Sequence, residues 1–140
     1  MTDLPAPHRC SVLVVDDDDD VRELLRVAIE ADGYHVACVD NGREALNHLR
    51  SHADTCIILL DLLLPVMDGT DFRSAQLQDR SLAWIPVILM SGASDPERLA
   101  RELGARQLIR KPFDLDAVKE ALRSVGCCQA RPRQRVGSGI

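Results

Sequence analysis

Short apolar runs alternate along the chain with stretches in which apolar residues recur at helical spacing. Each run is short and rich in aliphatic side chains, as buried strands are. The runs cover residues 10–15, 34–39, 55–60, 85–90 and 107–110. The helical spacing is clearest at Val21, Leu24, Leu25, Ala28 and Ile29. The pattern therefore predicts five strand–helix units.

Glycine, proline and asparagine residues mark where the helices between the runs begin and end. Gly33 stands where the first helix would be capped at its carboxyl end. Asn41 and Gly42 are expected to form a turn before the second helix. The later helices are expected at about residues 68–78, 96–104 and 115–125.

The run at residues 55–60, TCIILL, is apolar at nearly every position, so a strand there would be buried on both faces. Such strands need cover on both sides, which indicates a parallel sheet with helices on each face. Right-handed crossovers leave few topologies, and 140 residues suit one domain. The predicted fold class is therefore α/β, a doubly wound (βα)5 flavodoxin-like three-layer sandwich with parallel sheet order 2-1-3-4-5.

Composition and charge narrow the class of protein. The net charge of −5 disfavours nucleic acid as a partner, because phosphate backbones need a basic surface. No stretch approaches the roughly 20 apolar residues of a membrane span, and residues 1–9 do not form a signal peptide. We expect an N-terminal extension at 1–9, a folded domain at 10–125 and a flexible basic tail at 126–140.

The five cysteines, at positions 10, 38, 56, 127 and 128, are odd in number and include no C-x-x-C pair. Cys10, Cys38 and Cys56 lie in strand-like runs, where a buried thiol is the ordinary expectation. The sequence therefore predicts a reduced, cytoplasmic protein.

A polar side chain follows each of the five apolar runs, although Asp40, after the second, is expected at an edge of the sheet. Asp16 and Asp17 follow the first run, Asp61 the third, Ser91 the fourth and Lys111 the fifth. The carboxyl ends of parallel strands share one edge, and ligands bind where the strand order reverses, here between the first and third strands. We therefore expect three carboxylates, a hydroxyl and an ammonium to converge.

These side-chain types suit phosphoryl chemistry beside a divalent cation. Clustered carboxylates repel one another, and Mg²⁺ relieves that repulsion while keeping sites for water and phosphoryl oxygens. An aspartate can itself accept a phosphoryl group. Lys111 and Ser91 can then balance and hydrogen-bond the charged phosphoryl oxygens.

Four motifs occur in order, each at the end of a predicted strand. They are VLVVDDD at 12–18, LDLLLPVMDG at 60–69, VILMSG at 87–92 and RKPF at 110–113. Together they resemble the receiver domain of two-component response regulators, over about residues 11–125. The resemblance implies a stand-alone receiver rather than an enzyme, with Mg²⁺-dependent self-phosphorylation and autodephosphorylation as its only chemistry.

The resemblance also implies a role for each site residue. Asp61 matches the phosphoacceptor, Ser91 the switch hydroxyl and Lys111 the phosphoryl-binding lysine. Asp17 matches the direct metal ligand, and Asp16 a partner that often acts through water. The whole Mg²⁺ site would comprise Asp16, Asp17, Asp61 and the backbone carbonyl of Leu63. The Lys111-Pro112 peptide bond would be cis.

Partners follow from the same resemblance. A sensor histidine kinase or a histidine phosphotransfer protein would supply the phosphoryl group, and a downstream protein target would receive the signal. No output domain follows the receiver motifs, so protein contact is the expected output. The sequence does not decide whether the protein forms a homodimer.

One position departs from the family pattern. Many receivers carry an aromatic residue three positions before the lysine, and here that position is Leu108. Leucine has no ring to gate the pocket, so a phosphorylation-independent scaffold receiver with weak switching is the alternative function.

Other interpretations concern single features. A phosphatase of the haloacid-dehalogenase type would need a second acid where Leu63 stands. Asp18 and Asp68 are expected to cap helices rather than bind a ligand. His48 and His52 share i, i+4 spacing without a third ligand in the motif, so a solvated helix face is the favoured interpretation.

Overall fold

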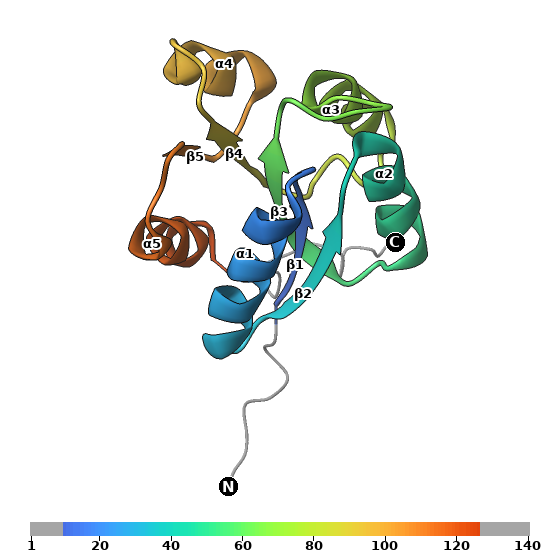
Figure 1. The fold of residues 1–140 in the computed structure, drawn as a ribbon. Helices are drawn as coiled ribbons and strands as arrows, with labels where there is room; N and C mark the ends of the chain where they lie inside the picture. Colours follow the sequence, from blue (N-terminus) through green and yellow to red (C-terminus); the bar gives the residue numbers. More distant parts are fainter. Residues whose placement is uncertain (1–9, 127–140) are drawn as a thin grey trace, which may run out of the picture.

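Five strands and five helices alternate along residues 10–126, the part of the chain that the computed structural model describes (Figure 1). The strands are β1 Ser11–Val15, β2 His35–Val39, β3 Thr55–Asp61, β4 Val87–Ser91 and β5 Gln107–Arg110. The helices are α1 Asp19–Ala31, α2 Gly42–Ser51, α3 Gly69–Gln78, α4 Pro96–Leu103 and α5 Leu115–Val125.

The strands form one parallel sheet in the order β2-β1-β3-β4-β5, which confirms the predicted flavodoxin-like topology. Several boundaries differ from the prediction by one or two residues: β1 and β2 begin one residue later, and β4 begins at Val87 rather than at residue 85. Ile85 closes a turn with Leu82, and Pro86 has no N–H to donate to a ladder. β3 and β4 each run one residue further than expected, to Asp61 and Ser91.

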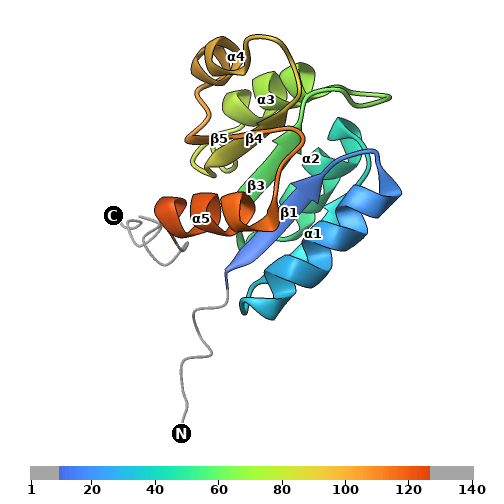
Figure 2. The same ribbon diagram turned by 60° about the vertical axis from the view of Figure 1, so that its left-hand side comes forward.

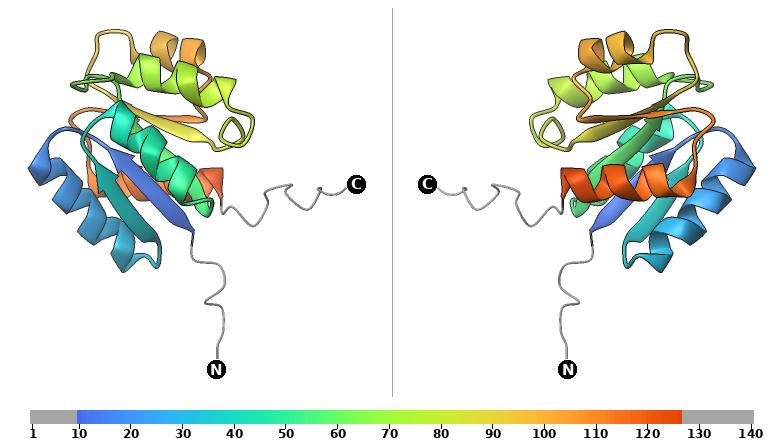
Figure 3. Two further views of the ribbon diagram at one scale, coloured as in Figure 1. Left: turned by 90° about the vertical axis from the view of Figure 1, so that its right-hand side faces the viewer. Right: turned by 90° about the vertical axis from the view of Figure 1, so that its left-hand side faces the viewer.

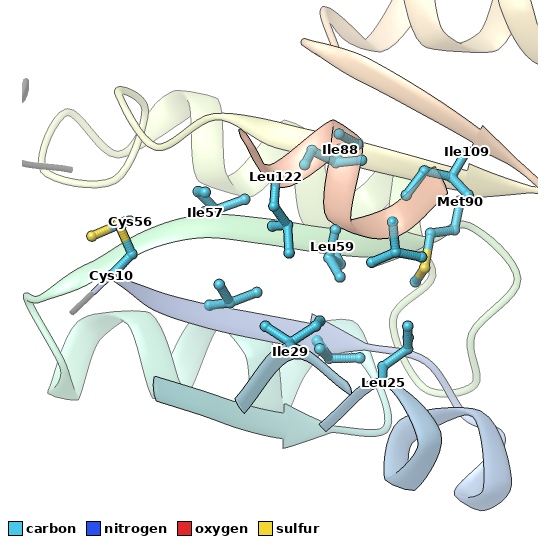
Figure 4. Packing of buried hydrophobic residues seen from close by; sticks show 14 residues of the cluster. Cys10, Leu25, Ile29, Cys56, Ile57, Leu59, Ile88, Met90, Ile109 and Leu122 are labelled. Carbon is cyan, nitrogen blue, oxygen red and sulfur yellow. The ribbon is translucent and has the colours of Figure 1, made fainter. Parts of the chain in front are cut away.

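Alternate residues of the central strands pack into two separate cores. One core lies between the sheet and α1 with α5, as the labelled side chains of Figure 4 show. The other core lies between the opposite face and α2 with α3. Figures 2 and 3 show α4 beside α3 on that second face. Because both faces are covered, β3 is buried at every position.

Each helix begins with a side chain that accepts hydrogen bonds from the first turn. Asp18 and Asp68 cap α1 and α3, which confirms the capping interpretation of both. The Asn41-Gly42 pair is not a separate turn: Asn41 caps α2 and Gly42 is its first residue. A Cβ at Gly42 would stand 2.5 Å from the Met67 carbonyl oxygen, so only glycine lets α2 begin against this loop.

The expectation that Cys10, Cys38 and Cys56 are all thiols is wrong for two of them. Cys10 and Cys56 are disulfide-bonded, whereas Cys38 is a free thiol. Figure 4 shows Cys10 and Cys56 side by side at the start of β1 and β3. The strand register shifts there, because Ser11 lies opposite Thr55 but Val12 lies opposite Ile57. Cys56 is therefore the extra residue of β3, beside Cys10.

Several expectations lie outside the described residues. These are the N-terminal extension at 1–9 and, beyond residue 126, the basic tail with Cys127 and Cys128. Within residues 10–126, no helix combines the length and the apolar character that crossing a membrane requires.

Candidate functional site

Three carboxylates meet at the carboxyl end of the two central strands. Asp16 and Asp17 follow β1 directly, and Asp61 is the last residue of the neighbouring strand β3. One oxygen from each carboxylate lies within 4.8 Å of the others. Asp16 and Asp61 are buried, whereas Asp17 faces solvent. The predicted convergence of these three residues is confirmed.

Lys111 brings a positive charge to the same rim. Its Nζ donates to Asp16 Oδ2 at 3.0 Å and to Asp61 Oδ2 at 3.1 Å. Lys111 follows β5 directly, and its backbone N–H donates to the carbonyl of Ser91 at 2.8 Å. The Lys111-Pro112 bond is cis, as expected. A residue 50 positions from Asp61 in the sequence is thus its ion-pair partner.

Burial and charge act in opposite directions on this ion-paired group. Burial raises the pKa of Asp61 above its ordinary value, and the charge of Asp16 adds to that, although Lys111 opposes both. Burial disfavours the ammonium of Lys111, but its hydrogen bond to Asp16 and the charge of Asp61 outweigh burial and raise its pKa. The lysine therefore stays charged, and the Asp61 carboxylate is poorly solvated.

Backbone groups hold the carboxylates in place. The N–H of Asp18 donates to Asp16 Oδ1 at 3.0 Å, and the N–H of Leu63 donates to Asp61 Oδ1 at 3.3 Å. The Leu63 side chain is 83% exposed, so it does not cover Asp61. A Cβ at Gly69 would stand 2.8 Å from the Asp61 carbonyl oxygen, so glycine permits the close return of this loop.

Ser91 and Leu108 lie on the strands beyond Asp61. Ser91 ends β4 and is buried, and its Oγ accepts a hydrogen bond from the N–H of Ala93 at 3.1 Å. Leu108 lies in β5 opposite Leu89 and is half-buried. Ser91 therefore lies at the same edge of the sheet as Asp61. Leu108 lies within β5 instead, where its side chain is partly exposed.

The donor set fits Mg²⁺. Two oxygens bound to one Mg²⁺ at 2.0–2.1 Å lie at most about 4.2 Å apart, and these three carboxylate oxygens already lie within 4.8 Å. All three are hard oxygen donors, and the exposed Asp17 leaves room for water on one side. Asp16, Asp17 and Asp61 can therefore hold the ion after small side-chain movements.

The other clustered side chains do not form a comparable site. The rings of His48 and His52 stack with centroids 4.1 Å apart, and with His35 and Asp54 they line a cavity of about 360 Å³. Among residues 10–126, only the group of Asp16, Asp17 and Asp61 brings three ligand atoms together.

Sequence reasoning missed two arginines that the structure places at important contacts. Arg22 donates to the backbone carbonyl of Asp16, and Arg73 donates to carbonyls at the end of α4. Neither stands in a motif, and arginine in an amphipathic helix ordinarily indicates a solvated face. No local signal distinguishes them.

Comparisons with known proteins agree with this geometry. Residues 12–123 match the response regulator receiver domain family, so the chain belongs to that family. It is 37% identical over 111 residues to the regulatory protein AtoC of Escherichia coli, matching 75% of this chain and 23% of AtoC. It is 35% identical over 116 residues to the transcriptional regulatory protein CseB of Streptomyces coelicolor, matching 81% of this chain and 48% of CseB. The chain thus spans less than half of each of these relatives.

Shorter relatives and solved structures match over most of their length. The two-component response regulator ORR3 of Oryza sativa is 34% identical over 110 residues, covering 77% of this chain and 82% of ORR3. The chemotaxis response regulator CheY4 of Vibrio cholerae superposes with a TM-score of 0.77 at 27% identity, covering 84% of this chain and 98% of CheY4. The fold and the acidic pocket are therefore those of a two-component response regulator receiver domain.

Proposed function

We propose that Asp61 accepts a phosphoryl group from a sensor histidine kinase or a histidine phosphotransfer protein, and that this modification switches contacts with a downstream protein. The reaction depends on Mg²⁺ bound by Asp16, Asp17, Asp61 and the backbone carbonyl of Leu63. Ser91 and Lys111 bind the transferred group.

The observation that supports this function is the meeting of three carboxylates and Lys111 on one rim of the sheet. A buried carboxylate cluster costs free energy unless a cation offsets it. Lys111 offsets only part of the charge, since one ammonium faces Asp16 and Asp61 while Asp17 stands beside them. The pocket therefore favours a divalent cation and, through it, a phosphoryl group.

In the proposed step, an oxygen of Asp61 attacks the phosphorus of a phosphohistidine. The new bond joins that oxygen to phosphorus, the bond from phosphorus to the donor imidazole nitrogen breaks, and the nitrogen takes up a proton. Bound Mg²⁺ supplies positive charge for the phosphoryl oxygens. Lys111 is already within hydrogen-bond distance of Asp61, so it needs little movement to pair with the group transferred there.

A second candidate function is phosphorylation-independent binding of a protein partner. Leu108 supports it, because an aliphatic side chain on β5 cannot gate the Ser91 pocket as an aromatic ring would. Under this alternative Asp61 still accepts the phosphoryl group, but the two states differ little and the partner binds both equally.

Intact-mass measurement after treatment with acetyl phosphate and Mg²⁺ tests the acceptor. The parent protein should gain one phosphoryl group, Asp61→Asn should gain none, and the matched control Asp71→Asn, which alters an exposed carboxylate of α3, should behave like the parent. Chelation of Mg²⁺ should prevent the gain. A parent protein that stays unmodified, or an Asp61→Asn variant that is still modified, would contradict the proposal.

A further inference from the structure

Arg22 makes a contact that the phosphoryl chemistry does not explain. Its Nη1 donates to the backbone carbonyl of Asp16 at 2.8 Å, and its Nη2 pairs with the carboxylate of Asp19. Its side chain is only 20% exposed, although it lies on a helix that begins at the surface of the molecule. The guanidinium is thus folded back over the start of α1.

The position of this arginine is unfavourable by itself. α1 begins at Asp19, so Arg22 lies in the first turn, where the partial positive charge of the helix end disfavours cations. A cation there also stands close to the place where Mg²⁺ would bind. A contact at this position therefore has to offset two repulsive effects.

The carbonyl that Arg22 holds belongs to the peptide that joins Asp16 to Asp17. β1 ends at Val15, and the N–H of Asp16 still donates to Val39 of β2 at 3.2 Å. The Asp16 carbonyl lies beyond the last ladder pair of β1 with β3, and its donor is the Arg22 guanidinium. Because the peptide unit is planar, fixing this carbonyl fixes the direction in which the Asp17 residue leaves the strand.

Asp17 depends on that direction more than its neighbour does. Asp16 is fully buried, and its two carboxylate oxygens are held by Lys111 and by the N–H of Asp18. Asp17 is exposed, so burial does not hold it. The adjoining peptide plane sets where the Asp17 Cα lies, and with it the distance over which its carboxylate has to reach toward Asp16 and Asp61.

We infer that Arg22 is a positioning residue that sets the Mg²⁺ affinity of the pocket by holding the Asp16–Asp17 peptide. The inference rests on the proposed function, since it needs Mg²⁺ to bind at the three carboxylates. Partners that orient metal ligands from outside the coordination sphere typically change metal affinity by 10- to 100-fold.

Position and charge predict opposite results when Arg22 is replaced. If Arg22 acted only through its charge, Arg22→Met would tighten Mg²⁺ binding and Arg22→Lys would leave it unchanged. If Arg22 positions the peptide, Arg22→Met weakens binding by about tenfold. Arg22→Lys also weakens it, because an ammonium lacks the planar fork that reaches both the carbonyl and Asp19.

Isothermal titration of Mg²⁺ into the unphosphorylated protein, without a phosphodonor, distinguishes these results. The control is Arg26→Met, one turn further along α1, which also loses a cation and its ion pairs to Glu23 and Glu30 but contacts no site residue. It should stay within twofold of the parent. Variants are compared at a temperature at which circular dichroism shows each to be folded, and Arg22→Lys alone decides the question if Arg22→Met does not fold.

Three results would contradict these proposals, and each shows which proposal fails. A parent protein that does not bind Mg²⁺ overturns the proposed function. A parent that binds, with Arg22 variants equal to it or tighter, overturns only the role of Arg22. Equal weakening by Arg26→Met also overturns that role, because the effect would then come from α1 as a whole.

Discussion

At the scale of single residues, the loop after Asp61 contains a backbone conformation that its sequence does not suit. Val66 has φ +66°, and a β-branched side chain at positive φ is rarely tolerated. Its side chain is 73% exposed, so packing does not compensate. We expect Val66→Gly to raise the free energy of unfolding by about 1 kcal/mol, measured by urea denaturation without Mg²⁺.

Leu63→Gly is the matched control for Val66→Gly. Leu63 is also exposed in this loop but has no positive φ, so glycine there adds only unfolded-state entropy. It should lower the free energy of unfolding by roughly 0.5–1 kcal/mol. If both variants were stabilised, glycine would be favourable throughout this loop. Strain at Val66 would then not be the cause of the stabilisation by Val66→Gly.

Asp61 itself should destabilise the metal-free fold at neutral pH. Burial raises the folded-state pKa of Asp61 above its unfolded value, so the unfolded chain releases the proton first and stability falls as the pH rises through the folded pKa. Asp61→Asn removes this loss. In a chelator it should melt above the parent at pH 7, and the difference should vanish below about pH 3.9.

Thermal melts across that pH range, with Asp116→Asn as the control, measure this effect. Asp116 is an exposed carboxylate in the first turn of α5, and unlike Asp61 it is not buried. Its replacement should not stabilise the protein at any pH. An Asp61→Asn variant less stable than the parent at pH 7 would mean that pairing with Lys111 outweighs burial.

Single residues were predictable where a motif carried them. Asp16, Asp17, Asp61 and Lys111 stand at strand ends, and parallel topology brings strand ends together. Arg22 was not predictable, because its contact is to a backbone carbonyl and leaves no trace in the pattern of side chains. Val66 was not predictable either, since its residue type favours extended backbone.

At the scale of elements, α4 is attached to the molecule mainly through its ends. Pro96 is its only buried residue, at its start. At its other end, Arg73 of α3 donates to the carbonyl of Leu103 at 2.8 Å and to that of Gly104 at 3.2 Å. Burial lowers the pKa of Arg73, and the terminal carbonyls of the helix offset its charge. α3 thus caps α4.

Arg73→Met should loosen α4 and cost about 1–2 kcal/mol of stability, because two partly buried carbonyls lose a charged donor. Hydrogen exchange of the amides in α4 should accelerate more than exchange in α5. Arg101→Met alters an exposed arginine of α4 itself and should change stability by less than about 0.5 kcal/mol. Unchanged exchange in α4 with Arg73→Met would mean that other contacts hold the helix.

The helices and strands were largely predictable because the hydrophobic pattern, the helix-capping residues and the glycine positions all indicate the same boundaries. Apolar runs, helix caps such as Asp68 and the left-handed Gly104 all mark the boundaries found. The disulfide-bonded state of Cys10 and Cys56 was not foreseen, because it depends on a register shift between β1 and β3. The Arg73 cap joins residues about 30 apart and follows from tertiary packing alone.

At the scale of the whole molecule, the fold concentrates like charge at the carboxyl edge of the two central strands. Topology places the ends of β1 and β3 side by side, and both end in carboxylates. Lys111 reaches across from β5 and offsets part of the repulsion by pairing with Asp16 and Asp61. The free protein therefore keeps an unrelieved repulsion that a divalent cation can remove, and binding and folding are linked.

Mg²⁺ should for this reason stabilise the whole fold by mass action. At 100 times its dissociation constant the gain is about 2.7 kcal/mol, which corresponds to a rise of several degrees in melting temperature. Asp17→Ala should lose this gain, yet in a chelator it should melt at or above the parent, because Asp17 is exposed and its removal relieves repulsion.

Arg22→Met should show the full gain, but only at about tenfold higher Mg²⁺. Melting scans over a Mg²⁺ series separate these cases, because under mass action a higher dissociation constant moves the onset of the shift to higher Mg²⁺. The onset should move about tenfold for Arg22→Met and much further for Asp17→Ala, which loses a ligand. An Asp17→Ala variant that still responds like the parent would place the cation elsewhere on the molecule.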